Sequence, residues 1–109
     1  MEIPQLWRQD NRSILIFNAT ADWITGDAPV AARNGTYYLV SDRHDGGFEF
    51  GGVLLAGNAG EYGLKLLRRP DGSTVSLAWL GYQTDGTFAG ALSDPMDVRF
   101  EADGRILVG

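Results

Sequence analysis

The sequence predicts an all-β domain, a small antiparallel sandwich or partly closed barrel of about seven to nine short strands with at most one short helix. Two observations lead to this prediction. Dipeptides that tolerate the backbone of tight hairpin turns separate β-favouring runs, at intervals of about 10 to 18 residues. Several of these runs alternate apolar and polar residues, as half-buried strands do. An antiparallel sheet with one covering helix, an α+β arrangement, is the alternative. The turn dipeptides are Asn34-Gly35, Asp45-Gly46, Asp71-Gly72, Asp85-Gly86 and Asp103-Gly104.

The first half of the chain contains three predicted strands. Ser13–Phe17 and Thr36–Ser41 are runs rich in β-branched, aromatic and aliphatic residues. Gly47–Ala56 is the third, and the Gly51-Gly52 pair inside it predicts a bulge or a close approach of another segment to the backbone.

The segment Thr20–Arg33 has two interpretations. In the first, Thr20 caps a short helix with an acid in its first turn, or Ala28–Arg33 forms a turn or two of helix that Asn34-Gly35 ends. In the second, Val30–Arg33 forms a hairpin with the strand that follows, and the hairpin turns at Asn34-Gly35. The alanine content favours the helix.

The strongest turn in the sequence is Arg69-Pro70-Asp71-Gly72. Proline presets φ at the second position of a type I turn, and Gly72 can supply the left-handed residue that completes a three-residue loop. We therefore expect strands at about 62–69 and 73–83 on either side of this loop.

The strand after Gly72 is apolar on both faces, which predicts a central strand that helix, sheet or a partner covers on both sides. Val75, Leu77 and Trp79 share one face, and Ala78, Leu80 and Tyr82 share the other.

Two elements complete the chain. Thr87–Leu92 is a predicted strand that ends before Asp94-Pro95. The last hairpin is indicated by charged residues that alternate with apolar ones from Asp97 to Asp103, and Arg105–Val108 is its return strand.

Length and composition indicate a single domain over residues 1–109, because one hydrophobic core usually serves a chain of this size. The absence of cysteine excludes disulfides, thiolate zinc sites and a cysteine nucleophile. The longest apolar runs, Ile14–Phe17 and Val53–Ala56, are far shorter than the ~18 residues of a membrane span, and no signal-peptide pattern is present. We therefore expect a soluble, cytoplasmic protein.

No residue pattern predicts catalysis. The single histidine, His44, lies between Asp42 and Asp45 in one polar loop, whereas the members of a catalytic triad generally come from separate elements. Asp42, Asp45 and Glu49 offer oxygen ligands but lack the spacing of a calcium loop. No phosphate-binding glycine motif is present. We therefore expect no enzymatic activity, no metal and no cofactor.

Charge provides the candidate binding site. Fourteen acids and nine bases give a net charge of -5, which disfavours direct contact with nucleic acids and anionic membranes. Seven of the acids lie between Asp10 and Glu61, a stretch with three arginines. An acidic excess of this kind also serves solubility. The protein-binding residues that we predict in this stretch are Asp42, Asp45, Glu49 and Glu61.

These observations favour a non-enzymatic, acidic protein-binding module that occupies a basic surface of a larger, nucleic-acid-handling partner, as an inhibitor or immunity-type protein does, for example a phage-encoded one. One alternative is a virion or assembly component that acts as a homo-oligomer. The other is a ligand- or carbohydrate-binding β-barrel. Aromatic residues such as Trp23 and Trp79 offer stacking platforms for sugars or hot spots for a protein.

Overall fold

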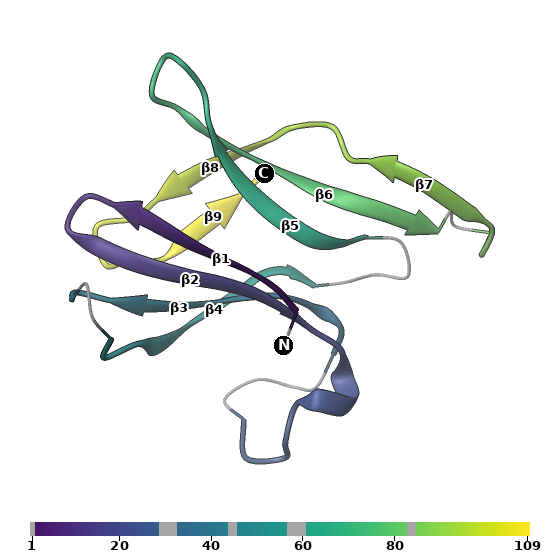
Figure 1. Ribbon diagram of the computed structural model, residues 1–109, viewed down its shortest axis with the longest axis horizontal. Helices are drawn as coiled ribbons and strands as arrows, with labels where there is room; N and C mark the ends of the chain where they lie inside the picture. The colour runs from purple at the N-terminus through teal and green to yellow at the C-terminus, as the bar shows by residue number, and fades with distance from the viewer. Residues whose placement is uncertain (1, 29–32, 44–45, 57–60, 83–84) are drawn as a thin grey trace.

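The computed structural model describes residues 2–28, 33–43, 46–56, 61–82 and 85–109 of the chain. These residues form nine strands and one turn of 3-10 helix, arranged as two antiparallel sheets of four and five strands (Figure 1). The all-β prediction is confirmed. The α+β alternative is wrong, because the 3-10 helix at Ala21–Trp23 is too short to cover a sheet. Within the described ranges, no helix is long and apolar enough to cross a membrane.

The N-terminal half of the chain forms the four-stranded sheet, in which each strand pairs with the next. Its last three strands were predicted within a few residues. The first was not, because its residues are mostly exposed and include Pro4, so that its pattern does not alternate cleanly. The strands are β1 (Glu2–Gln9), β2 (Arg12–Ala19), β3 (Gly35–Ser41) and β4 (Glu49–Ala56).

The C-terminal half forms the five-stranded sheet, and all of its strands were predicted. Its strands are β5 (Glu61–Arg68), β6 (Thr74–Tyr82), β7 (Phe88–Leu92), β8 (Met96–Phe100) and β9 (Ile106–Val108). β6 pairs with β5 along one edge and with both β7 and β8 along the other. The predicted central position of this strand within its sheet is therefore confirmed, but the predicted cover on both faces is not, because Trp79 exposes 43% of its surface.

The predicted turn after β5 is confirmed in detail. Arg69 N–H donates to the carbonyl of Ser73 (2.8 Å) and Gly72 N–H donates to the carbonyl of Arg69 (2.9 Å), which closes a three-residue loop. Gly72 has a φ of +89°, a left-handed conformation that costs glycine little. The turn between β8 and β9 repeats this pattern around Gly104, whose φ is +92°.

The glycine pair in β4 forms a bulge, as predicted. Gly52 lies opposite Tyr38 and Phe50 lies opposite Leu39, so that Gly51 is an extra residue on the β4 side of the ladder. The ring of Tyr38 occupies the space where a side chain at Gly51 would lie. The bulge thus admits a buried aromatic ring against the backbone.

The segment between β2 and β3 matches neither interpretation fully. It contains one turn of 3-10 helix, and Thr20 at its start makes no side-chain capping hydrogen bond. The hairpin interpretation is wrong, because β2 and β4 already pair with the two edges of β3. Asn34 accepts a hydrogen bond from Ala21 N–H (2.8 Å) through its Oδ1 atom instead of forming a turn. Residues 29–32, which belong to the second predicted helix, lie outside the described residues.

The two sheets pack face to face around a mainly aliphatic core. β5 crosses the inner face of the four-stranded sheet and contacts all four of its strands. The four-stranded sheet contributes Ile14, Ile16 and Tyr38 to the core, and the five-stranded sheet contributes Leu64, Leu66, Ala78, Val98 and Ile106.

One edge of β5 is buried against this inner face without a neighbouring strand, so its backbone groups need other partners. Three polar side chains supply them. Gly63 N–H donates to Asn18 Oδ1 (3.1 Å), and Leu64 N–H donates to Thr36 Oγ1 (3.4 Å). Gln5 pairs with the backbone of Leu66. These side chains fix how the two sheets cross.

Candidate functional site

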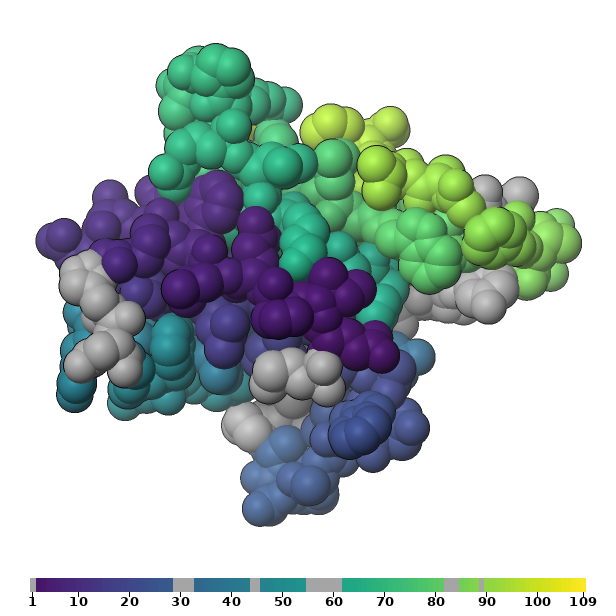
Figure 2. All heavy atoms as spheres, in the orientation of Figure 1, coloured from purple at the N-terminus to yellow at the C-terminus, as the bar shows by residue number. Residues whose placement is uncertain are grey.

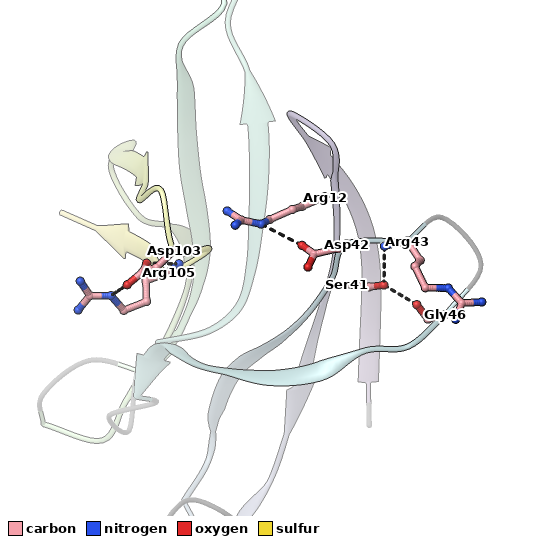
Figure 3. Close-up of polar contacts among 7 residues, drawn as sticks. All are labelled: Arg12, Ser41, Asp42, Arg43, Gly46, Asp103 and Arg105. Carbon is pink, nitrogen blue, oxygen red and sulfur yellow. Dashed lines mark hydrogen bonds and ion pairs between the residues drawn. The ribbon is translucent and has the colours of Figure 1, made fainter.

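A cleft of about 390 Å³ lies between the end of the four-stranded sheet and the β8–β9 turn, and Figure 3 shows several of the side chains that line it. Six charged side chains line it, three basic and three acidic, with Tyr38 and Val40 among the other lining residues. The charged residues are Arg12, Asp42, Arg43, Glu49, Asp103 and Arg105.

Ion pairs and hydrogen bonds tie these groups to their neighbours. Arg12 Nε donates to Asp42 Oδ1 (3.2 Å), and Arg105 Nε donates to Asp103 Oδ2 (2.9 Å). Ser41 Oγ accepts a hydrogen bond from Arg43 N–H (2.9 Å) and donates to the Gly46 carbonyl. The cleft therefore has balanced charge and presents no strong field of either sign to a ligand.

The structure brings two of the four predicted binding residues together. Asp42 and Glu49 are both exposed and both line the cleft. Asp45 lies outside the described residues, as does the neighbouring His44, and only the backbone of Glu61 is described. The prediction did not include the arginines that accompany Asp42 and Glu49. Only the strand register, with Ser13 opposite Ser41, shows that residues 12 and 42 meet.

The aspartates of three Asp-Gly turns accept hydrogen bonds within their own turns. Asp71 Oδ1 accepts hydrogen bonds from Ser73 Oγ (2.6 Å) and Ser73 N–H (2.9 Å), and Asp85 accepts the same pair from Thr87. Asp103 accepts from Arg105 N–H (3.1 Å). These hydrogen bonds lower the pKa of all three carboxyl groups, which are therefore ionised at neutral pH and unsuited to act as general acids.

Metal ligands do not gather in the parts of the chain that the structure describes. No group of three histidine, aspartate or glutamate side chains there is close enough to hold an ion.

A second candidate surface is the outer face of the five-stranded sheet, which is apolar. Trp79 lies opposite Leu92, and the rings of Trp79 and Phe88 are 6.3 Å apart between centroids. Trp79, Leu92 and Phe88 expose 43, 66 and 68% of their surface, and Leu67 on β5 is also exposed. Clustered apolar exposure of this kind marks interaction sites, whereas isolated exposed apolar residues do not.

Two glycines leave room for each aromatic ring to lean over its own strand. A Cβ atom at Gly81 would lie 2.9 Å from the Trp79 ring, and one at Gly90 would lie 2.8 Å from the Phe88 ring. The rings therefore lie over their own strands, and not in the core. The sequence signal is an aromatic residue with glycine two positions later, which occurs in both β6 and β7.

β7 itself extends from the body of the molecule. It packs chiefly on β6, and together they project away from the four-stranded sheet (Figures 1 and 2). The five residues Phe88–Leu92 include no charged side chain. Exposed edge strands usually carry charges or proline that prevent pairing with other chains, so an uncharged apolar edge indicates a contact surface.

A third surface, on the outer face of the four-stranded sheet, is also apolar. The rings of Phe17, Tyr37 and Phe50 form a row with centroid separations of 5.9 and 6.5 Å. Tyr37 is buried here, while Tyr38 faces the core, as the alternation along β3 requires. Beside the row lies an open hollow of about 230 Å³. Trp23, which exposes 73% of its surface, also lines this hollow.

Comparisons with known proteins show the fold alone. No family model and no curated protein matches the chain. Two solved structures are similar: Cellvibrio cellulosa alpha-L-arabinanase, with 19% identity and a TM-score of 0.59, and the same protein complexed with arabinohexaose, with 18% identity and a TM-score of 0.60. The similarity covers 97 and 99% of this chain but 36% of the arabinanase chain in each case. This chain is therefore similar in fold to about a third of a longer protein.

Proposed function

We propose that this chain is a non-enzymatic protein-binding module that binds through the outer face of its five-stranded sheet. The observation that supports this proposal is the exposed apolar cluster of Trp79, Phe88 and Leu92 on β6 and β7. Aromatic residues, Trp and Phe among them, are enriched in protein interfaces, and Trp is one of the residue types that most often contribute a large share of the binding energy. Trp79 and Phe88 are residues of this kind.

Carbohydrate binding is the competing explanation for exposed aromatic rings, and one similar arabinanase structure contains arabinohexaose. The geometry favours protein. The planes of Trp79 and Phe88 are inclined by 58°, so they offer no common platform on which neighbouring sugar rings stack. Leu92, which lies opposite Trp79, is also exposed, and this suits the apolar centre of a protein interface better than a hydroxyl-rich ligand.

A second candidate rests on charge. The chain carries a net charge of -5, and Asp42 and Glu49 are exposed, which supports docking of the acidic residues 42, 45, 49 and 61 on a basic surface of a larger partner. An inhibitor or immunity-type protein acts in this way. Docking through charge weakens as salt rises, whereas docking through an apolar face does not, so ionic strength separates the two candidates.

Site-specific crosslinking in an extract of the source cells tests the proposal. A photoreactive phenylalanine analogue in place of Phe88 should capture a protein that the same analogue does not capture in place of Leu6. Leu6 is the matched control, because it is exposed to a similar extent (62%) but lies on the four-stranded sheet.

The captured partner is then purified and its affinity measured. Phe88→Ala should weaken binding at least about 30-fold, the equivalent of a hot-spot contribution of about 2 kcal/mol, while Leu6→Ala should leave it unchanged. Equal capture at both positions, or an affinity that does not depend on Phe88, would overturn the proposal.

A further inference from the structure

The two apolar surfaces of this chain differ in shape. The outer face of the five-stranded sheet protrudes at β7, where Phe88 and Leu92 expose about two thirds of their surface, at 68 and 66%. The outer face of the four-stranded sheet has a hollow instead, lined by Phe17, Trp23 and other apolar residues. One molecule thus carries a protruding apolar surface and an apolar hollow.

The hollow has the size and chemistry for an aromatic side chain. Its volume is about 230 Å³, and a cavity of about 150 Å³ with an apolar lining already holds a benzene molecule. Most of the lining is aromatic or aliphatic and includes Phe17, Trp23, Ile24, Tyr37 and Phe50.

The chain cannot fill its own hollow with β7. In Figure 1 the segment that borders the hollow, Ala21–Ala28, lies at the bottom of the view, whereas β7 lies at the upper right. The protruding strand and the hollow also belong to different sheets. Contact between them therefore requires two molecules.

We propose that β7 of one copy docks into the hollow of a second copy, with Phe88 as the inserted side chain. This inference rests on the proposed function and names the partner as the chain itself. Because the two contacting surfaces are different patches, the contact is head-to-tail, and each added copy leaves one protruding strand and one hollow available. Such contacts produce a ring if the rotation closes and an open filament if it does not.

The charges around the two surfaces predict how this assembly responds to salt. Asp22 and Asp27 lie in the segment that borders the hollow, and Asp85 lies in the turn just before β7. All three are exposed acids, so docking brings like charges together. Added salt screens this repulsion, and self-association should strengthen as ionic strength rises. Docking of the acidic residues on a basic partner would have the opposite dependence.

Sedimentation velocity over a range of protein concentrations tests the inference. Wild-type protein should form species larger than a monomer, and more of them at high salt. Phe88→Asp removes the inserted ring, and Trp23→Asp removes one wall of the hollow. Each variant alone should be monomeric. Leu6→Asp is the control, since Leu6 is exposed on the same sheet as the hollow but does not line it, and this variant should assemble like the wild type.

Mixing the two variants provides the decisive measurement. The Phe88→Asp protein keeps an intact hollow and the Trp23→Asp protein keeps an intact β7, so an equimolar mixture should form a heterodimer that grows no further. A contact between identical patches would give no such rescue. Both variants change exposed side chains, and chemical denaturation verifies that they fold; if Trp23→Asp fails to fold, Trp23→Ser replaces it.

Two results would overturn the inference. One is wild-type protein that stays monomeric at all concentrations and salt conditions, and the other is a mixture of the two variants that stays monomeric. Either result leaves the protein-binding proposal intact if Phe88 still determines crosslinking to a different protein. The proposed function fails under a different result, in which neither self-association nor binding to another protein depends on Phe88.

Discussion

The side-chain amide of Gln5 pairs with both backbone polar groups of Leu66. Gln5 Nε2 donates to the Leu66 carbonyl, and Leu66 N–H donates to Gln5 Oε1, each over 2.9 Å. A neighbouring strand makes this same pair of hydrogen bonds in a sheet. Gln5 lies on β1 of one sheet and Leu66 on β5 of the other, so one side chain joins the two sheets through backbone hydrogen bonding.

Replacing Gln5 with methionine should destabilise the fold by about 2 kcal/mol or more, because an unpaired buried N–H or carbonyl costs about 1–3 kcal/mol. Methionine has a similar shape but cannot form either hydrogen bond. Urea denaturation measures the difference, and Leu6→Met at the neighbouring exposed position is the control that should stay near the wild-type value. A Gln5→Met variant as stable as the wild type would show that the Leu66 backbone finds other partners.

Gly51→Ala should destabilise the protein by at least about 1–3 kcal/mol, the usual cost of forcing extra atoms into a packed core. The new Cβ atom would lie 2.2 Å from the Tyr38 ring, which is buried and whose hydroxyl accepts a hydrogen bond from Ile106 N–H. Gly26→Ala is the matched control, because a Cβ atom there meets nothing within 4 Å. Thermal or chemical unfolding of both variants compares them directly, and equal losses would contradict the packing argument.

Stability should fall as pH rises from about 10 to about 12, in part through Tyr62. Burial of its hydroxyl, and then the hydrogen bond to Glu2 and the charge of that residue, raise the pKa of Tyr62 to about 12. Its ordinary value is about 10. In this range the folded state holds a proton that the unfolded state has lost, so deprotonation favours unfolding. Tyr62→Phe should reduce this slope in urea denaturation measured across the range. An identical slope in the variant would exclude Tyr62 as its source.

If the acidic residues guide the chain to a basic partner, Asp45→Lys combined with Glu49→Lys should slow association at least about tenfold while the melting temperature barely changes. Association of the wild type should also slow as salt rises past ~0.15 M, where the Debye length is about 8 Å. Surface plasmon resonance at two ionic strengths measures both effects. A flat salt response would leave the apolar faces as the binding surfaces.

Local turn chemistry explains why most of the fold was predictable. Asp71-Gly72 and Asp103-Gly104 combine a glycine in left-handed conformation with an aspartate that accepts hydrogen bonds from the residue after the glycine. Both signals are contained within four residues of sequence. β1 forms a hairpin with β2, but its turn, Asp10-Asn11, contains no glycine and places Asp10 at a left-handed φ of +54°. The contacts of β1 with the other sheet, from Gln5 and from Lys65 Nζ, which donates to the carbonyls of Ile3 and Pro4, join residues about sixty positions apart.

The candidate site was less predictable for the same reason. The acidic character of residues 42–49 is visible in the sequence, but two of the three arginines in the cleft, Arg12 and Arg105, come from β2 and from the β8–β9 turn. The predicted cover over the face of Trp79 is not seen among the described residues, and Trp79 exposes 43% of its surface. Its exposure could not be foreseen, because alternation along a strand shows which residues share a face and not whether another layer covers that face.

In the five-stranded sheet, β6 pairs with β5 along one edge and with β7 and β8 along the other. This arrangement means that the hydrogen-bond ladders of the sheet do not all open together. β7 is attached by a single ladder, so its hydrogen bonds can open without disturbing the ladders of β5, β8 or β9. Amide protons in the β6–β7 ladder therefore exchange through local opening, whereas those in the β5–β6 ladder exchange only when the sheet itself comes apart. If another chain binds β7, the amide protons of this strand should exchange more slowly for as long as the complex lasts.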